Sequence, residues 1–390
     1  MARALMPPPR RPILFLVANQ AWNLVNYRSG LIRALSDDGW EIVAVAPAEP
    51  AMAARLMELG CRFEAIPLDA KGLSPLAELR TFVSLWRLIR RHRPQALLSW
   101  TIKANLWSAL AARLTGTAAI VNVSGLGIAF DGRGLLRRLA GLLYRVCLAR
   151  AAMVFFQNET DRDALVGTGL VRAKQARLLP GSGVDPAWFA PAHRDRPASR
   201  RYVLIARLLA PKGVREFVAA ARLVRPTRPE LRFALVGFLD VANATAIPRC
   251  EVEGWVGEGL VEYYEPVDDV RPLLDDAEAV VLPSYYREGL SRALLEAAAM
   301  ARPAITTDWP GCREAVVDGV TGFLCAPRDP RSLADAIERL AALDEAEWRA
   351  MGDAARARIE REFTESVVID RYREALASAF TSSRSRSASS

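Results

Sequence analysis

Short apolar runs alternate with amphipathic helical segments along the chain, and this alternation restricts the possible folds more than any other feature. In the first half, strand-like runs occupy residues 13–19, 41–47, 61–67, 95–100, 118–123 and 153–157. Helical patterns lie between them, for example at residues 24–35. Continuous apolar runs of this length, separated by helices, indicate a parallel sheet that is covered on both faces.

The same alternation starts again in the second half. Strand-like runs occupy residues 202–206, 232–236, 261–264, 279–282 and 304–306, and helical patterns occupy residues 214–223, 291–300, 331–343 and 346–380. A length of 390 residues is sufficient for two hydrophobic cores. We therefore predict an α/β protein with two tandem, doubly wound, Rossmann-like domains.

The domain boundaries follow from shifts in composition. The stretch 180–200 is rich in Gly, Pro and Ser, which is typical of a linker; we place the linker at residues 184–200, so the predicted domains are residues 13–183 and 201–363. Residues 364–380 form a terminal helix, whereas residues 1–12 and the low-complexity tail 381–390 are expected to be disordered. Ligands of doubly wound domains bind beyond the carboxyl ends of the strands, so we expect an active site in a cleft between the domains.

Charge is distributed unevenly between the two halves. The chain carries 52 basic and 44 acidic side chains, but residues 1–200 hold 27 basic and only 14 acidic ones. Two basic segments, 81–93 and 132–150, have apolar faces that either pack on the sheet or lie on anionic lipid. We favour packing for the first segment and membrane contact for the second. Exposed stacking aromatics are not interleaved with these arginines, so we do not expect a nucleic-acid partner.

The remaining composition narrows the chemistry. The five cysteines are scattered and the chain has only two histidines, which argues against disulfides, structural zinc and a His-based metal site. Apolar runs long enough to span a bilayer do not occur, and the N-terminus lacks the features of a signal peptide. We expect a cytoplasmic chain.

The segment REGLSRALLE is the most informative stretch for function. Glu288 lies in a polar loop after a buried strand, and Glu296 lies on the helix that follows. The loop 288–291 precedes the helix N-terminus, where backbone N–H groups and the helix dipole favour an anion. A phosphate bound there would leave Glu296 to accept hydrogen bonds from sugar hydroxyls. The alternative is that both glutamates are solvated surface charges.

A second candidate segment, ARLLAPKG, follows the strand-like run 202–206. It places Arg207 and Lys212 between the carboxyl end of that strand and the next helix. Two cations at this place can neutralise a diphosphate, although a basic loop of this kind can also be a solvated turn. Together with the Glu288 loop, it predicts a nucleotide-diphosphate site.

These segments resemble the retaining glycosyltransferases of family 4, which have the GT-B fold of two Rossmann-like domains. REGLSRALLE is similar to their E-x7-E motif, ARLLAPKG to their Arg/Lys diphosphate clamp, and residues 308–324 to the stretch that follows. The segments SWTIKAN, NVSGLGIAF, FFQNETDRD and LLPGSGVD resemble a subgroup that acts on polyprenyl-diphosphate-linked sugars, such as N-acetylgalactosaminyltransferases. The resemblance extends over residues 13–372 and implies that the terminal helix 364–380 crosses back onto the N-terminal domain.

The resemblance implies a role for each matching residue. Arg207 and Lys212 would hold the donor diphosphate, and Glu288 would contact the transferred sugar. Glu296 would bind the ribose, beside a loop of donor-binding residues: Gly289, Leu290 and Ser291. The acceptor would meet the N-terminal domain at Lys103, Asn105, Asn122, Ser124 and Gly125. For Lys103, an ordinary surface position remains open.

The resemblance also implies the partners. The donor would be a UDP-sugar, the acceptor a lipid-diphosphate-linked saccharide, and the enzyme would lie at the inner face of the cytoplasmic membrane without a metal or other cofactor. Two positions depart from the family: Ser124 replaces a common histidine, and Tyr264-Glu265-Pro266 replaces a glycine near the nucleobase. The first points to the lipid-linked subgroup, and the second leaves base selectivity open.

Three other functions remain as alternatives. A nucleotide-sugar epimerase has the same fold but needs acid and base residues, and the chain is poor in histidine. An NAD(P)-dependent oxidoreductase would use a glycine-rich turn, but residues 124–127 lack the third glycine of the dinucleotide motif. A non-catalytic sugar-binding protein would not need the Arg, Lys and Glu set.

Overall fold

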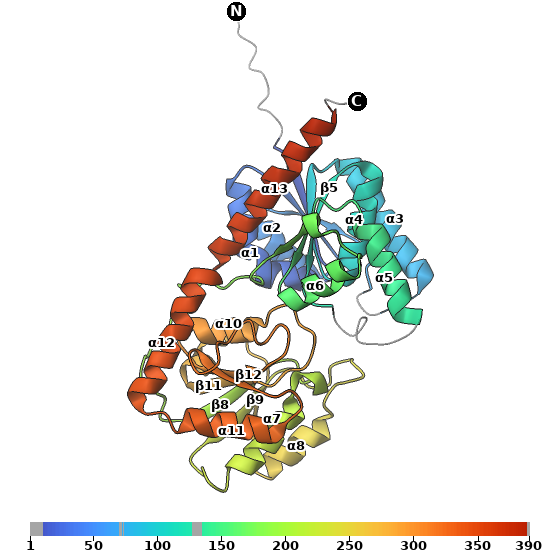
Figure 1. Ribbon diagram of the computed structural model, residues 1–390. Coiled ribbons are helices and arrows are strands. Elements are labelled where there is room, and N and C mark those ends of the chain that lie inside the picture. Colours follow the sequence, from blue (N-terminus) through green and yellow to red (C-terminus); the bar gives the residue numbers. More distant parts are fainter. Residues whose placement is uncertain (1–10, 70–71, 73, 127–134, 388–390) are drawn as a thin grey trace, which may run out of the picture. The chain divides into compact units, whose positions relative to one another are not determined.

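Two compact units make up the chain. The computed structural model describes residues 11–69, 72, 74–126 and 135–387 (Figure 1). Unit 1 runs to Ser124, resumes up to Leu179 and includes the chain from Ile369 onward. Unit 2 contains Gly125 and the residues from Pro180 to Val368.

Unit 1 is built around a seven-stranded parallel sheet with the order β3-β2-β1-β4-β5-β6-β7. The strands are β1 (Ile13–Val17), β2 (Glu41–Ala46), β3 (Arg62–Ala65), β4 (Ala96–Trp100), β5 (Ala118–Val123), β6 (Met153–Phe156) and β7 (Ala176–Leu178). Its helices are α1 (Ala21–Asp37), α2 (Pro50–Glu58), α3 (Pro75–His92), α4 (Ile102–Thr115), α5 (Leu135–Leu148), α6 (Glu159–Gly167) and most of α13 (Glu365–Ser387).

Unit 2 is built around a six-stranded parallel sheet with the order β10-β9-β8-β11-β12-β13. The strands are β8 (Arg201–Ile205), β9 (Arg232–Val236), β10 (Glu262–Tyr264), β11 (Ala277–Leu282), β12 (Ala304–Thr307) and β13 (Gly322–Cys325). Its helices are α7 (Val214–Val224), α8 (Arg249–Gly257), α9 (Arg271–Asp275), α10 (Arg292–Ala299), α11 (Pro330–Ala341) and α12 (Glu345–Glu362). The prediction of tandem Rossmann-like domains is confirmed.

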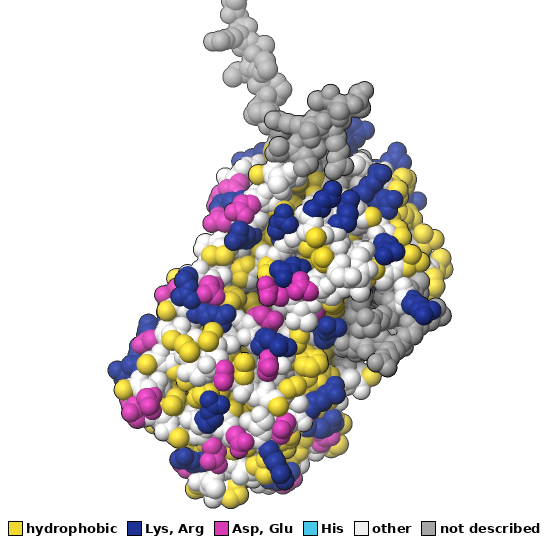
Figure 2. All heavy atoms as spheres, in the orientation of Figure 1, with side chains coloured by type: hydrophobic (Ala, Val, Ile, Leu, Met, Phe, Trp, Pro, Cys, Tyr) yellow, Lys and Arg dark blue, Asp and Glu magenta, His cyan; other side chains and the backbone are white. Residues whose placement is uncertain are grey.

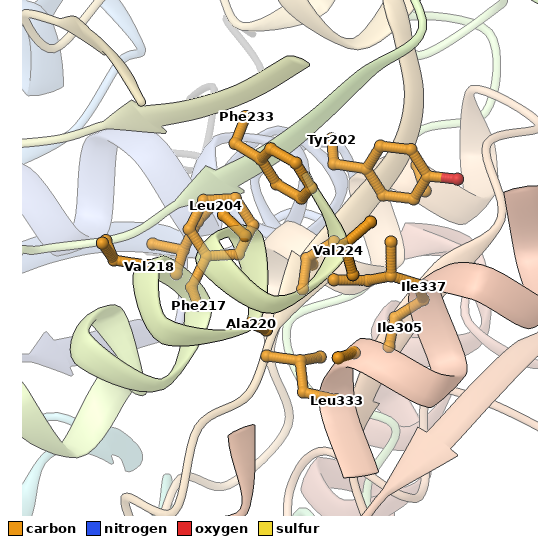
Figure 3. Packing of buried hydrophobic residues seen from close by; sticks show 14 of the residues in the cluster. Tyr202, Leu204, Phe217, Val218, Ala220, Val224, Phe233, Ile305, Leu333 and Ile337 are labelled. Carbon is orange, nitrogen blue, oxygen red and sulfur yellow. The ribbon is translucent and has the colours of Figure 1, made fainter. Parts of the chain in front are cut away.

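Both faces of the unit 2 sheet are buried, as the unbroken apolar strands require. Along β11, Ala279 and Val281 belong to a cluster that includes residues of α7 and α11. Figure 3 shows part of that cluster, with Phe217 and Leu204 packed beside Phe233. The alternate residues of β11, Val280 and Leu282, belong to a second cluster with α10 and α12. Successive strand residues point to opposite faces, so one strand serves both cores.

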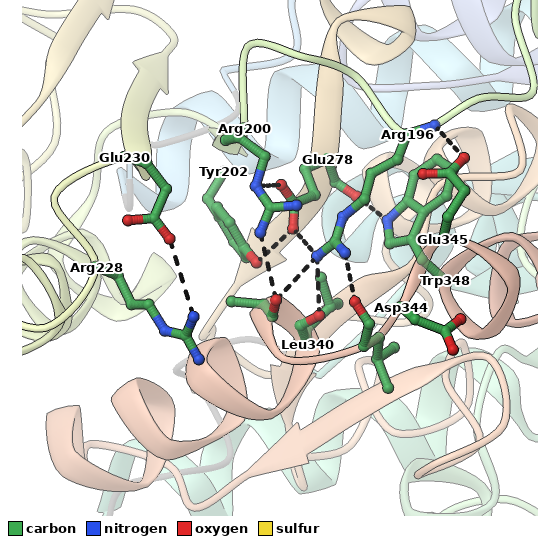
Figure 4. A network of polar contacts seen from close by, with 12 residues as sticks. Arg196, Arg200, Tyr202, Arg228, Glu230, Glu278, Leu340, Asp344, Glu345 and Trp348 are labelled. Carbon is green, nitrogen blue, oxygen red and sulfur yellow. Dashed lines mark hydrogen bonds and ion pairs between the residues drawn. The ribbon is translucent and has the colours of Figure 1, made fainter.

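The stretch 184–200 is packed into unit 2 and does not form a free linker. Its Arg196 and Arg200 form ion pairs with Glu278, whose side chain is completely buried, at 2.5 and 2.9 Å (Figure 4). The Tyr202 hydroxyl donates a third bond to the same carboxylate at 3.0 Å. The buried acid accounts for this packing, because a buried carboxylate is stable only when it is paired and hydrogen-bonded.

Most predicted strands match observed ones to within one or two residues, and the differences lie at sheet edges and helix ends. The short strands β7 and β13 were not predicted, because neither forms an apolar run of the usual length. The helical stretch 346–380 is divided into α12 and α13, because the Thr364 hydroxyl accepts the Val367 N–H and starts a new helix. Helix α13 continues to Ser387 beyond its expected end, and residues 1–10 and 388–390 lie outside the described residues.

Among the described helices, none combines the length and the apolar character needed to cross a bilayer.

Candidate functional site

The strand order of unit 2 reverses between β8 and β11, and the candidate donor-site residues gather at this place. β8 and β11 are neighbours in the sheet, but the strands that follow each of them lie on opposite sides. The loops after the two strands therefore diverge and leave room for a ligand at the carboxyl edge, as in other doubly wound sheets. Arg207 and Lys212 follow β8, and Glu288 follows β11.

The loop after β8 is held close to β11 by a glycine. Gly213 has φ +78°, and a Cβ at this position would lie 2.1 Å from the carbonyl oxygen of Pro283. Only glycine allows this backbone conformation and this approach without strain. A one-turn 3-10 helix, Ala210–Lys212, precedes it and places Lys212 beside the loop after β11. Arg207 is exposed at the start of the same loop.

Lys212 and Glu288, predicted from separate motifs, form a direct ion pair. The distance from Lys212 Nζ to Glu288 Oε1 is 2.5 Å, and the two side chains are 12% and 15% exposed. The buried Ser284 hydroxyl donates to the same carboxylate oxygen at 3.0 Å. Lys212 also lies over the Tyr286 ring, 5.6 Å from its centroid. Lys212 and Glu288 thus form an ion pair between two largely buried side chains.

The loop between Glu288 and α10 is fixed by a second glycine. Gly311 has φ +87°, and a Cβ there would lie 2.5 Å from the carbonyl oxygen of Glu288. The Gly311 carbonyl accepts the backbone N–H of Ser291 at 3.0 Å. The expectation that the Ser291 amide is open to a ligand is therefore wrong, because this amide is already bonded. Gly289 is buried, and Leu290 packs on the adjacent apolar cluster.

Glu296 lies on α10, one turn after Arg292. The Arg292 Nε donates to Glu296 Oε1 at 2.7 Å, and both side chains are more than four-fifths buried. Burial raises the pKa of Glu296 above its usual value, while the Arg292 guanidinium acts in the opposite direction. Sequence reasoning missed Arg292, although its spacing of four residues from Glu296 on a helix was a usable signal.

Two of the predicted acceptor residues are structural. Asn122 and Asn105 are buried in unit 1, and the Asn105 amide donates to the Asn122 carbonyl at 2.7 Å. The Asn122 amide donates to the Tyr372 hydroxyl at 2.9 Å, and its Oδ1 accepts from Gln157 at 3.1 Å. This network corrects the prediction that Asn105 and Asn122 contact the acceptor, because both amides stabilise the interior of unit 1.

The other predicted acceptor residues occupy different environments. Lys103, at the start of α4, forms an ion pair with Glu78 of α3 at 2.5 Å and donates to the carbonyls of Asp69 and Gly72, so it connects α4 to the chain before and within α3. Ser124 is exposed at the carboxyl end of β5. Gly125, with φ +104°, lies in unit 2, where a Cβ would approach the carbonyl oxygen of Arg287 to 2.6 Å. Of this group, only Ser124 offers an exposed side chain.

Two family models match consecutive parts of the chain. The glycosyl transferase 4-like domain matches residues 24–182, and the model named glycosyl transferases group 1 matches residues 199–342. Together they include every candidate site residue. The match of both models favours a transferase over the epimerase, oxidoreductase and non-catalytic alternatives.

Known proteins with similar sequences and structures agree with this assignment. The chain is 24% identical over 367 residues to an N,N'-diacetylbacillosaminyl-diphospho-undecaprenol alpha-1,3-N-acetylgalactosaminyltransferase of Campylobacter jejuni, covering 90% of this chain and 94% of the relative. The fold of this chain is similar to that of a glycosyltransferase from Rickettsia africae, with a TM-score of 0.78, 15% sequence identity and coverage of 95% of this chain and 99% of the other.

A second solved structure is that of Anabaena Alr3699/HepE in complex with UDP. The fold of this chain is similar to that structure, with a TM-score of 0.77, 18% sequence identity and coverage of 94% of this chain and 100% of the other. The chain therefore belongs to the GT-B glycosyltransferases of family 4, with an N-terminal glycosyl transferase 4-like domain and a C-terminal group 1 domain.

Proposed function

We propose that this protein transfers a hexose or N-acetylhexosamine from a UDP-sugar to a polyprenyl-diphosphate-linked saccharide in bacterial surface glycan assembly, with retention at the anomeric carbon. The relative from Campylobacter jejuni, whose name specifies a lipid-diphosphate-linked acceptor, matches nearly the full length of the chain. A similar fold binds UDP in the Anabaena structure. The nature of the donor and the acceptor is inferred from these two likenesses.

The observation that carries the proposal is the Lys212–Glu288 pair at the carboxyl edge between β8 and β11. When the bond from the sugar to UDP breaks, negative charge develops on the departing diphosphate. Lys212 and the exposed Arg207 would stabilise that charge, and this is electrostatic catalysis that requires no bound metal ion. Glu288 would stay next to the reacting carbon, oriented by the Ser284 hydroxyl.

Glu296 would bind the ribose of the donor. Its carboxylate is held on the first turns of α10, the helix whose N-terminal dipole end faces the loop 288–291 and favours an anion. On the acceptor side, the exposed Ser124 at the end of β5 would contact the acceptor, whereas Asn105 and Asn122 are buried and would not.

We further propose peripheral association with an anionic membrane surface through α3 and α5 of unit 1. Leucines stand exposed on the outer sides of both helices, with Leu76 59% and Leu142 57% exposed. Exposed arginines accompany them, namely Arg80, Arg87, Arg90, Arg91, Arg138 and Arg145. Figure 2 shows yellow and dark blue side chains gathered over this part of unit 1, at the upper right. Mixed apolar and basic faces of this kind suit anionic lipid.

A UDP-release assay with a panel of UDP-sugars, with and without undecaprenyl-diphosphate-linked saccharide, tests the proposed reaction. We expect release that depends on the lipid-linked acceptor, and an α-linked product by NMR from an α-linked donor. Glu288→Ala and Lys212→Met should each reduce the rate by about a hundredfold or more, as is typical when a group that stabilises transition-state charge is removed.

The matched controls are Glu258→Ala and Arg222→Met, which break an exposed ion pair elsewhere in unit 2. Their rates should stay near that of the wild type. Release of UDP without any dependence on the lipid would count against the proposed acceptor. Full activity of Glu288→Ala would remove the site assignment, and loss of activity in EDTA would contradict catalysis without a metal.

A further inference from the structure

Arg292 stands at a position where helix physics alone disfavours a cation. It is the first residue of α10, and a positive charge at a helix N-terminus is opposed by the helix dipole. The order Arg292 followed by Glu296 is also the less favourable orientation for an ion pair four residues apart on a helix. The local structure of α10 therefore does not explain why an arginine occupies this position, whereas its contacts outside the helix do.

The Arg292 guanidinium connects two parts of unit 2. Its Nε donates to Glu296 Oε1 at 2.7 Å. Its Nη1 donates to the Ser182 hydroxyl and to the Gly183 carbonyl, both at 3.2 Å. The planar guanidinium directs these N–H groups at fixed angles, which an ammonium group cannot reproduce. One side chain thus holds the Glu296 carboxylate and the turn 180–183 in a defined relation.

The turn 180–183 is itself firmly attached. Gly183 has φ +73°, and a Cβ there would lie 2.7 Å from the Cα of Glu365. The next residue, Val184, donates its N–H to the Phe363 carbonyl at 2.9 Å and accepts from the Glu365 N–H at 3.1 Å. On the other side, a Cβ on Gly181 would be 3.1 Å from Leu290. Arg292 is therefore bonded to a segment that is itself hydrogen-bonded to the end of α12 and the start of α13.

The two carboxylate oxygens of Glu296 have different surroundings. Oε1 is occupied by Arg292, whereas in the described part of the chain Oε2 accepts no hydrogen bond. With 17% of its side chain exposed, Glu296 is largely buried but keeps some contact with the surface. A carboxylate that is fixed through one oxygen presents the other at a constant position, which favours binding because less side-chain freedom is lost.

We propose that Arg292 is a positioning residue that fixes Glu296 against the turn 180–183, so that Oε2 accepts the ribose hydroxyls of a nucleoside diphosphate. This inference rests on the proposed function, in which Glu296 binds the donor ribose. Arg292 acts through Glu296 and does not contact the ribose itself. Its contribution should therefore appear only when the ligand carries ribose hydroxyls.

Calorimetric titration of the full chain with UDP and with 2′,3′-dideoxy-UDP tests this. The wild type should bind UDP more tightly by about tenfold or more, the usual range for hydrogen bonds to a charged group. Arg292→Met should lose most of this preference by weakening UDP, while binding of dideoxy-UDP stays unchanged. Arg292→Lys should recover only part of the preference, and Ser182→Ala should reduce it less than Arg292→Met. The control Arg349→Met, which breaks an exposed pair with Glu345 on α12, should keep it.

The outcomes separate the two proposals. If Glu296→Gln leaves the preference for UDP intact, Glu296 does not bind the ribose and that part of the proposed function fails, whatever Arg292 does. If Glu296→Gln abolishes the preference but Arg292→Met weakens both ligands equally, or weakens neither, the positioning role is overturned and the ribose assignment stands. Should Arg292→Met not fold, Arg292→Lys and Ser182→Ala provide the same comparison.

Discussion

At the scale of single residues, the candidate site consists of charges that are paired in advance. Lys212 and Glu288 neutralise one another at 2.5 Å, as do Arg292 and Glu296 at 2.7 Å. All four side chains are at least four-fifths buried, so removing one partner costs the other buried charge its ion pair. Both motifs that supply these residues were visible in the sequence. The Lys212–Glu288 pair was not, because these residues meet only through the contact of two loops, whereas the four-residue spacing of Arg292 and Glu296 was readable.

The raised pKa of Glu296 predicts how UDP affinity depends on pH. Burial raises the pKa of this carboxyl group, so protonation on acidification begins at a higher pH than for an exposed glutamate. The charged form is needed to accept ribose hydroxyls, so UDP affinity should fall on acidification earlier than an ordinary glutamate would cause. Titration calorimetry at a series of pH values checks this against Glu296→Gln. An identical pH profile of the two proteins would contradict the assignment.

The same shift has the opposite effect on folding. Because the pKa of Glu296 is higher in the folded protein than in the unfolded chain, the folded state binds the proton more tightly. Its contribution to stability is therefore present below the unfolded pKa and is lost as the pH rises through the folded pKa. Ligand binding and stability thus respond to this group in opposite senses, as is common at functional sites.

At the scale of elements, helix α13 completes the interior of unit 1. Tyr372 is buried, and its hydroxyl accepts hydrogen bonds from Trp100 Nε1 and Asn122 Nδ2, both at 2.9 Å. Its ring contacts Phe155 with centroids 5.3 Å apart. Strands β4, β5 and β6 therefore depend on a residue more than 200 positions later in the chain.

Tyr372→Phe should destabilise unit 1 although it removes a single oxygen atom. The change leaves two buried N–H donors without their acceptor, at a cost of about 1–3 kcal/mol for each. Urea unfolding followed by tryptophan fluorescence measures the shift. The matched control is Tyr264→Phe, whose partly exposed hydroxyl donates to Glu262 and can be replaced by water. Equal shifts for the two variants would mean that the Tyr372 hydroxyl has no special role.

At the scale of the whole molecule, charge separates the two halves. The excess of positive charge belongs to residues 1–200, which include the basic helices α3 and α5. Thr81, Leu85 and Ile89 of α3 are buried, so this face of the helix lies in the interior of unit 1, where α3 packs against α4. The arginines and the leucines at its start remain exposed on the other side. Both helices therefore present a basic outer surface, whereas sequence reasoning favoured only the second.

Sedimentation with lipid vesicles tests that surface. The protein should bind anionic vesicles, release them at high salt and bind neutral vesicles weakly. Replacing Arg87 and Arg91 by Glu should reduce binding by about tenfold or more, since each basic residue near an anionic surface contributes about 1 kcal/mol. The double change of Arg228 and Arg232 to Glu in unit 2 alters the net charge equally and should leave binding unaffected. Equal losses for the two double variants would exclude a specific lipid-facing side.

The sequence by itself determined the class of fold and most of the candidate donor site. Periodicity is a local property, so apolar runs and helical patterns predicted β1, β5, β9 and α10 within a residue or two of their observed ends. The Asp329-Pro330 start of α11 was equally readable, and the Asp329 carboxylate caps the Arg331 and Ser332 N–H groups at 3.0 and 3.1 Å. The spacing of Glu288 and Glu296 also needed only sequence.

Tertiary structure alone decided which residues meet. The strand order places β8 beside β11, and this adjacency brings Lys212 to Glu288 across 76 positions of sequence. It also buried Asn105 and Asn122, which the sequence presented as polar residues near strand ends, and it joined Arg292 to Ser182. Such contacts depend on which strands pair and on how the interior is filled. Those are properties of the packed chain, and no local pattern of residues encodes them.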